Sequence, residues 1–175
     1  MTFKSEIQLN EYASFYGGYI DLIERDLNLV EALRNSYSLF LEYFQNLTDE
    51  KSNYRYAHDK WSLKEVLLHC IDTERIMAYR ALRFSRNDKA KLPGFEQDEY
   101  VLESHAAQRN ISDLIDEYIS VRNSTMSLFR GFNENQLIRS GIASGKNMSV
   151  RALGFVISGH ELHHLNVCRK KYILD

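Results

Sequence analysis

Hydrophobic residues recur at steps of three and four in four segments of the chain, the pattern of a buried helix face. The first segment begins at Leu27 and ends near Leu47. Asp26, just before it, is expected to accept hydrogen bonds from the free amides of the first turn. The inward positions of this predicted helix are Leu29, Val30, Leu33, Tyr37, Phe40, Leu41 and Phe44.

The second helix has the clearest predicted start in the chain. Ser62 and Glu65 form a capping box, and Trp61 can pack on the first turn from the position before the cap. The hydrophobic period continues to about Arg86, so this helix is roughly 36 Å long, the length of a bundle helix.

Two further helices complete the pattern. Ser112 is expected to open the third helix, which ends near Phe132, and Ser149 to cap the fourth, which ends near Tyr172. The inward positions of the third helix are Leu114, Ile115, Tyr118, Val121, Met126 and Phe129.

The segments between these helices lack a sustained period. Residues 1–26 are interpreted as an irregular, aromatic-rich lead-in that packs on the helices, and 48–60, 87–110 and 133–148 as loops. Four amphipathic helices of this length predict an all-α four-helix bundle. We find no internal repeat, so residues 1–175 are expected to form a single domain.

Composition narrows the functional classes. Among 175 residues, 44% are apolar and 26% charged, while one proline and eight glycines disfavour a turn-rich β fold. A net charge of −2 offers no basic field for nucleic acid. Two cysteines form no disulfide framework, which suits the cytoplasm. The N-terminus lacks the apolar core of a signal peptide, and no apolar run is long enough to span a membrane.

The candidate chemistry concentrates in the last helix. His160 and His164 are one turn apart on the same face, so both imidazoles can reach one divalent ion. His69, in the second helix, has Val66, Thr73 and Ile76 at helical spacing, so it also points inward and is the candidate third ligand. The alternative is that His160 and His164 are core or surface histidines with no ion, and that His69 is a hydrogen-bonded core histidine. His58 and His105 fall in loops and are interpreted as surface residues.

Three neighbouring residues leave alternatives open. Glu161 completes an H-E-x-x-H pattern, in which it would be the general base of a zinc peptidase, but no downstream histidine or glutamate follows as a third ligand. It could otherwise orient a ligand histidine or face solvent. His163 is only an alternative ligand. Cys168 lies one turn beyond His164 and is either a thiolate ligand or a small buried apolar residue.

The sequence resembles the DinB-like (DinB/YfiT) superfamily of small metal-binding four-helix bundles. Three stretches carry the resemblance: YRYAHDKWSLKEVLLHCIDTERIMAYRALRFSRND, LPGFEQDEY and GHELHHLNVCRKKYI. It implies an up-down-down-up helix order, with residues 87–110 as the crossover, and a metal triad of His69, His160 and His164. It also implies a zinc or nickel ion as the expected metal, and a homodimer.

Characterised relatives include transferases and isomerases that use low-molecular-weight thiols, so the resemblance implies a thiol-dependent enzyme acting on a small-molecule substrate. A metal-dependent hydrolase and a non-catalytic metal-binding or interaction bundle are the alternatives. Asp72 and Arg80 are candidates for orienting substrate, or else for an ion pair within the bundle. Tyr56 and Trp61 are candidate pocket walls, with Trp61 otherwise a plain core residue.

Overall fold

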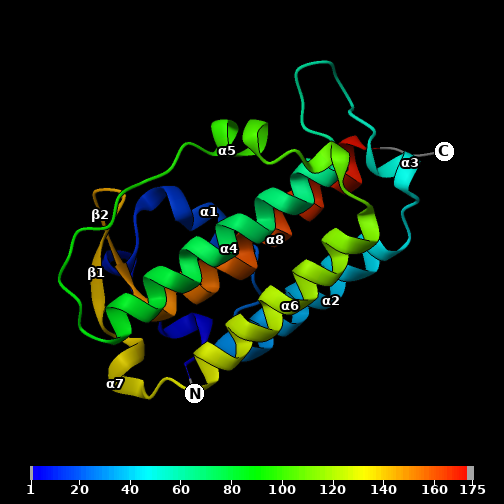
Figure 1. The fold of residues 1–175 in the computed structure, drawn as a ribbon. Helices are drawn as coiled ribbons and strands as arrows, with labels where there is room; N and C mark the ends of the chain where they lie inside the picture. The colour runs from blue at the N-terminus through cyan, green and yellow to red at the C-terminus, as the bar shows by residue number, and fades with distance from the viewer. Residues whose placement is uncertain (1, 173–175) are drawn as a thin grey trace.

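Four long helices of the computed structural model lie side by side as a bundle, which confirms the predicted fold class (Figure 1). The structure describes residues 2–172; Met1 and 173–175, the ends of the expected single-domain range, lie outside the described residues. The bundle helices are α2 (Leu29–Gln45), α4 (Leu63–Ser85), α6 (Ile111–Arg130) and α8 (Val150–Lys171).

The helix order is the predicted one. Helices α2 and α8 run in one direction and α4 and α6 in the other, so the chain goes up, down, down and up (Figure 1). The parallel pair α4 and α6 needs a crossover connection, and residues 87–110 provide it. Each of α2 and α4 contacts both α6 and α8.

Two of the predicted helix starts are confirmed by their caps. The Ser62 hydroxyl accepts from the Glu65 amide, and the Glu65 carboxylate accepts from the Ser62 amide at 2.6 Å. The Ser149 hydroxyl accepts from the amide of Ala152 at 3.1 Å. Each cap satisfies amides that the first turn leaves without a helical partner.

The other two predicted starts are wrong by one or two residues. Asn28, not Asp26, caps α2, and its side chain accepts from the amides of Val30 and Glu31. Helix α6 begins at Ile111 rather than Ser112. Its first amide donates to the Asp49 carboxylate at 2.9 Å, a partner far away in the sequence, so local spacing could not locate this start.

The segments expected to be loops hold short elements. Their sequences carry too few residues for a period, so tertiary contacts set them. Strands β1 and β2 pair as an antiparallel hairpin, in which Gly145 adopts a positive φ of 73°. The short elements are α3 (Asp49–Ser52), α5 (Gln97–Glu103), η4 (Ala106–Gln108), α7 (Glu134–Leu137), β1 (Ser140–Ala143) and β2 (Lys146–Ser149).

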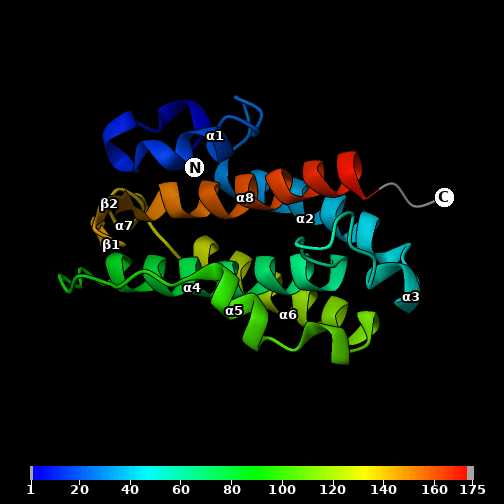
Figure 2. The same cartoon turned by 90° about the horizontal axis from the view of Figure 1, so that it is seen from above.

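The lead-in is mostly short turns of helix that pack against α8. Figure 2 shows it as a layer on the side of α8 that faces away from α4. Glu11 fixes it there, since its carboxylate accepts from Arg151 and from the Ser149 hydroxyl. Its elements are η1 (Lys4–Glu6), η2 (Leu9–Glu11), η3 (Ser14–Tyr16) and α1 (Gly17–Ile20).

Gly159 brings the lead-in close to α8. A Cβ at this position would lie 2.1 Å from the Tyr19 carbonyl oxygen, so Gly159→Ala should displace α1. We expect a loss of about 1–3 kcal/mol in the free energy of unfolding, measured by chemical denaturation. Gly18→Ala is the control, because nothing lies within 4 Å of its Cβ. Equal stability of the two variants would contradict the close contact.

The core is two apolar clusters separated by a polar layer. Each bundle helix passes from one cluster to the other at a buried polar residue. In α2 the residue is Ser36, in α4 Glu74, in α6 Arg122 and in α8 Glu161. The buried polar residues of the four helices therefore meet at one level, halfway along the bundle. None of the helices in residues 2–172 combines the length and apolar character needed to cross a membrane.

Candidate metal centre

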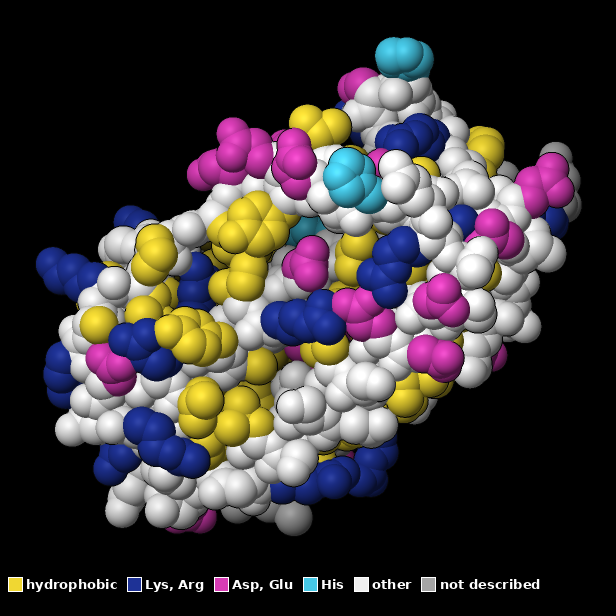
Figure 3. Space-filling model, in the orientation of Figure 1, with side chains coloured by type: hydrophobic (Ala, Val, Ile, Leu, Met, Phe, Trp, Pro, Cys, Tyr) yellow, Lys and Arg dark blue, Asp and Glu magenta, His cyan; other side chains and the backbone are white. Residues whose placement is uncertain are grey.

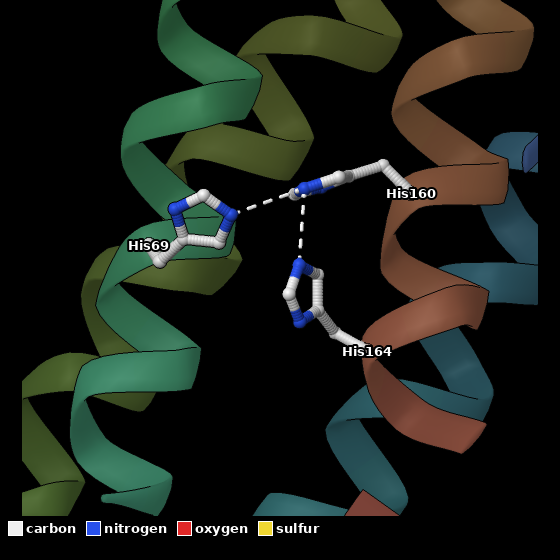
Figure 4. Close-up of side chains that lie close together, drawn as sticks. All are labelled: His69, His160 and His164. Carbon is white, nitrogen blue, oxygen red and sulfur yellow. Dashed lines mark hydrogen bonds between the residues drawn. The ribbon is translucent and has the colours of Figure 1, made fainter. Parts of the chain in front are cut away.

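Three imidazole rings converge between α4 and α8 (Figure 4). The Nε2 atom of His160 lies 3.1 Å from Nε2 of His69 and 3.1 Å from Nε2 of His164. One nitrogen from each ring lies within 4.8 Å of the other two, and this is the one such group of potential metal ligands among the described residues. The structure thus brings together all three histidines predicted from the sequence.

The helix geometry explains this convergence. His160 and His164 are one turn apart on α8 and project from the same face. His69 is two turns into α4, which runs antiparallel to α8 and packs along it. The first turns of α4 therefore lie beside the last turns of α8.

Hydrogen bonding alone satisfies these nitrogens poorly. An imidazole nitrogen has one in-plane site, which holds either a proton or a lone pair. Nε2 of His160 therefore cannot make two well-directed hydrogen bonds to its two neighbours. A cation at the centre would accept all three lone pairs. Around a tetrahedral ion with bonds of 2.0–2.1 Å, ligand nitrogens lie about 3.3 Å apart, close to the two distances in the structure.

Burial keeps the three rings in the neutral form that a metal requires. It lowers the pKa of His69 to about 4 and, with the nearby His69 and His163, that of His164 to about 3. The pKa of His160 is also well below its usual value, first through burial and then through the neighbouring histidines. No proton has to leave the site at neutral pH before a cation enters it.

The same pKa shifts predict acid sensitivity of the metal-free protein. Below pH 6.5 the unfolded chain binds protons on these histidines and the folded chain does not, so stability should fall as the pH falls. Each histidine contributes about 1.4 kcal/mol per pH unit to the fall in the free energy of unfolding. For His69 this contribution continues down to its folded pKa of about 4. Denaturation of the chelator-treated protein between pH 6.5 and 4.5 measures this slope, which His69→Leu should reduce by one histidine's share. An unchanged slope in that variant would contradict the prediction.

Two aromatic side chains flank the cluster. Trp61 lies against His69 with ring centroids 4.8 Å apart and parallel to His164 at 6.3 Å. Tyr19 of the lead-in meets His160 edge-on at 5.4 Å. Trp61 is half-buried, packs on one of the two apolar clusters and lies beside two of the histidines, so it is both a core contact and a wall of the site.

Two cavities reach the cluster from different directions. One, of about 400 Å³, is lined by Tyr56, Trp61 and His164, among others, as expected for the two aromatic residues. The other, of about 210 Å³, is lined by Tyr19 and His160. Figure 3 shows a hollow on the face formed by α4 and α5, with a histidine at its floor and acidic, basic and apolar side chains around it. A small molecule therefore has access to the histidine cluster.

The remaining histidines and Cys168 contribute no atom to the three-nitrogen group. His58 and His105 are exposed, as expected. His163 is half-buried and packs against Tyr19. Cys168 is buried in an apolar cluster, and burial raises the pKa of its thiol to about 12, which fits the interpretation as a small core residue.

The alternatives for Glu161 that involve solvent or peptidase chemistry are wrong. Glu161 is buried in the polar layer, where it accepts from the Tyr118 hydroxyl and, at 3.0 Å, from Arg122. Both hydrogen bonds go to Oε1, and Oε2 is buried beside a cavity of only about 10 Å³, which is too small for a peptide substrate. The contacts of Glu161 are with the core rather than with a ligand histidine.

The sequence analysis missed the rest of this polar layer. Arg122 is fully buried and donates to the Glu74 carboxylate at 2.8 Å. It also donates to the Leu33 carbonyl at 2.7 Å and the Ser36 hydroxyl at 3.1 Å. The available signal was a charged residue at an inward position, since Arg122 falls one turn after Tyr118 and one turn before Met126.

Asp72 and Arg80 differ in their partners. Asp72 lies 3.7 Å from Arg75 on the same helix, the ion pair that was one of the expected alternatives. Arg80 is buried and contacts neutral groups, and within residues 2–172 it forms no intrahelical or interhelical ion pair.

A sequence model of the DinB superfamily matches residues 32–168, most of the chain and all three histidines of the cluster. No curated protein sequence matches the chain.

Two solved structures share the fold. YfiT from Bacillus subtilis, described as a probable metal-dependent hydrolase with an unusual four-helix bundle topology, superposes with a TM-score of 0.69 and 12% identity over 81% of this chain and 85% of YfiT. The mycothiol-dependent maleylpyruvate isomerase superposes with a TM-score of 0.67 and 9% identity over 95% of this chain. The chain spans 62% of that isomerase's length.

Proposed function

The chain belongs to the DinB superfamily, and from that membership and the histidine cluster we propose that it is a metal-dependent enzyme that uses a low-molecular-weight thiol. In this proposal His69, His160 and His164 hold a divalent ion, with zinc or nickel as the expected metal. The reaction is a transfer or isomerisation on a small electrophilic substrate.

One observation carries the proposal: three neutral imidazole nitrogens converge at the inner end of two cavities. Three protein nitrogens leave a coordination position open, the arrangement that distinguishes catalytic from structural zinc sites. A metal bound there lowers the pKa of a thiol or water at that position and so supplies the nucleophile at neutral pH.

The residues around the histidines indicate how water is kept from the site and where the thiol comes from. The Trp61 and Tyr19 rings cover the histidines on two sides and limit the entry of water. Neither cysteine belongs to the group of converging ligand atoms, and burial raises the pKa of both thiols. In our proposal the thiol therefore comes from outside the chain.

The neighbours favour two reaction classes. The isomerase neighbour uses a thiol, whereas YfiT is described as a probable hydrolase, so hydrolysis is our second candidate. The same histidines and cavities serve either reaction, and the difference lies in whether thiol or water takes the open position.

The experiment measures metal content and ligand preference together. Protein purified without a histidine tag is analysed for metals, reloaded with cobalt and titrated with glutathione, bacillithiol and mycothiol. A sulfur-to-cobalt absorption band that saturates with one thiol, followed by turnover of a model electrophile with that thiol, is the expected result. Turnover of ester or amide substrates without any thiol would favour the hydrolase. Protein that binds no divalent metal would overturn both.

Two expectations from the sequence stay predictions. The homodimer is tested by sedimentation at several protein concentrations. The cytoplasmic location is tested by fractionation of the source cells.

A further inference from the structure

Arg80 is a buried cation without a carboxylate partner. Its residue is 3% exposed, and no acidic side chain in residues 2–172 forms an ion pair with it. Buried arginines are normally paired, because an uncompensated charge in the interior is costly. By contrast, Arg122 is equally buried and binds two glutamates.

The contacts of Arg80 are all with neutral groups. Its Nη2 atom donates to the Pro93 carbonyl at 2.8 Å and to the Ser144 hydroxyl at 3.1 Å, while Nη1 approaches the Met77 sulfur at 3.7 Å. A guanidinium has five N–H donors, so donors remain for a ligand. Burial lowers the pKa of Arg80, and the Tyr16 hydroxyl partly opposes this.

Arg80 lines the cavity of about 210 Å³ that His160 also lines. Between them lies Thr73, whose buried hydroxyl has no hydrogen-bond partner among the described residues. His69, Thr73, Met77 and Arg80 follow one another at helical spacing on α4, over about 16 Å of helix. Of the Arg80 contacts, the one with the Met77 sulfur lies on the side of the histidines, one turn closer to them on α4.

We propose that this cavity binds a short-chain carboxylic acid, with its carboxylate on Arg80 and its reactive end at the three histidines. Thr73 donates to, or accepts from, a polar group in the middle of the ligand. The inference rests on the proposed function, because it names the class of substrate or thiol that the metal centre receives.

The size and charge of the cavity favour a small monoanionic group. A volume of about 210 Å³ is below the range of drug-sized sites, so the chain of the acid is short. Arg80 is the cavity's one lysine or arginine in the described part of the chain, and Glu96 at the rim is acidic and exposed. Both hydrogens of Nη2 are already donated, so a carboxylate can hydrogen-bond to an N–H group left on Nε or Nη1, and one carboxylate balances the charge of the guanidinium.

The test compares charged and neutral ligands of equal length. Cobalt-loaded protein is titrated with ω-mercaptoacids of increasing length and with the matching mercaptoalcohols, and the sulfur-to-cobalt band gives each dissociation constant. We expect the best acid to bind at least about tenfold more tightly than its alcohol. Arg80→Met should remove this preference and Arg80→Lys should retain part of it.

Arg75→Met is the matched control, because Arg75 lies on the same helix but pairs with Glu117 outside the cavity. The Arg75→Met variant loses the same charge as Arg80→Met and should keep the preference for acids over alcohols. Calorimetric titration of the metal-loaded protein with glutarate, which has no thiol, tests the anion site separately.

The outcomes separate the two proposals. A thiol band without preference for acids overturns the carboxylate site and leaves the thiol function standing. Glutarate binding that Arg80→Met abolishes, with no band for any thiol, supports the carboxylate site and overturns the thiol function. If Arg75→Met also loses the preference for acids, the role of Arg80 is overturned, because the preference would then depend on the net charge of the protein. If the protein shows no thiol band and does not bind glutarate, both proposals are overturned.

Discussion

His160→Ala is expected to weaken binding of a divalent metal by more than about a hundredfold. Nε2 of His160 lies 3.1 Å from the nearest nitrogen of each of the other two rings, so its loss removes the central donor of the group. Residues that only orient a metal ligand are worth about ten- to a hundredfold in affinity, and a ligand is worth more. Competition with a chromophoric chelator, on untagged protein, measures the dissociation constant.

His163→Ala is the matched control for this prediction. His163 is on the same helix, but its ring packs on Tyr19 and its nitrogens are outside the three-histidine group. Its removal should change the metal affinity by no more than about threefold, since it takes away a ring beside His164 but no ligand nitrogen. Equal losses in the two variants would mean that the ion is held elsewhere, and unchanged binding in His160→Ala would remove His160 from the site.

The sequence predicted the part of the molecule that depends on local spacing. Helix periodicity located all four bundle helices, and the i, i+4 pair in α8 put two imidazoles on one face. His69 could be added because its helical neighbours Val66, Thr73 and Ile76 indicate an inward position. These inferences need only the geometry of single helices and their packing in a bundle.

What the sequence did not predict depends on partners far away in the chain. The start of α6 is fixed by Asp49, and β1 is joined to the crossover loop through the contact of Leu92 with Ala143. Neither can be inferred from neighbouring residues. Arg80 was a candidate for both an ion pair and a substrate contact, and only the three-dimensional structure shows that no carboxylate in the described part of the chain pairs with it.

The polar layer is the largest of these omissions, since charged residues at inward positions conflict with a purely apolar core. Arg122 can be buried because three other helices supply its acceptors: Leu33 and Ser36 on α2, Glu74 on α4 and Glu161 on α8. The layer therefore links the four helices in a single register. It also adjoins the metal centre, since Glu161 follows His160 directly.

Arg122→Met is expected to lower the free energy of unfolding by about 3–5 kcal/mol, because it leaves two buried glutamates without their cation. For a chain of this size that corresponds to a fall of about 6–20 °C in the melting temperature. Arg130→Met, an exposed position at the end of the same helix, should cost about 0.5 kcal/mol or less.

Replacing the whole layer separates the charge from the packing. In Arg122→Met with Glu74→Leu and Glu161→Leu, no buried charge remains unpaired, so most of the lost stability should return. Chemical denaturation of the three proteins measures this difference. If the single variant were as stable as wild type, the charges would have to reach water in the folded state, which their burial in this structure contradicts. If the triple variant folds but binds metal more weakly, the layer also holds His160 in position for the ion.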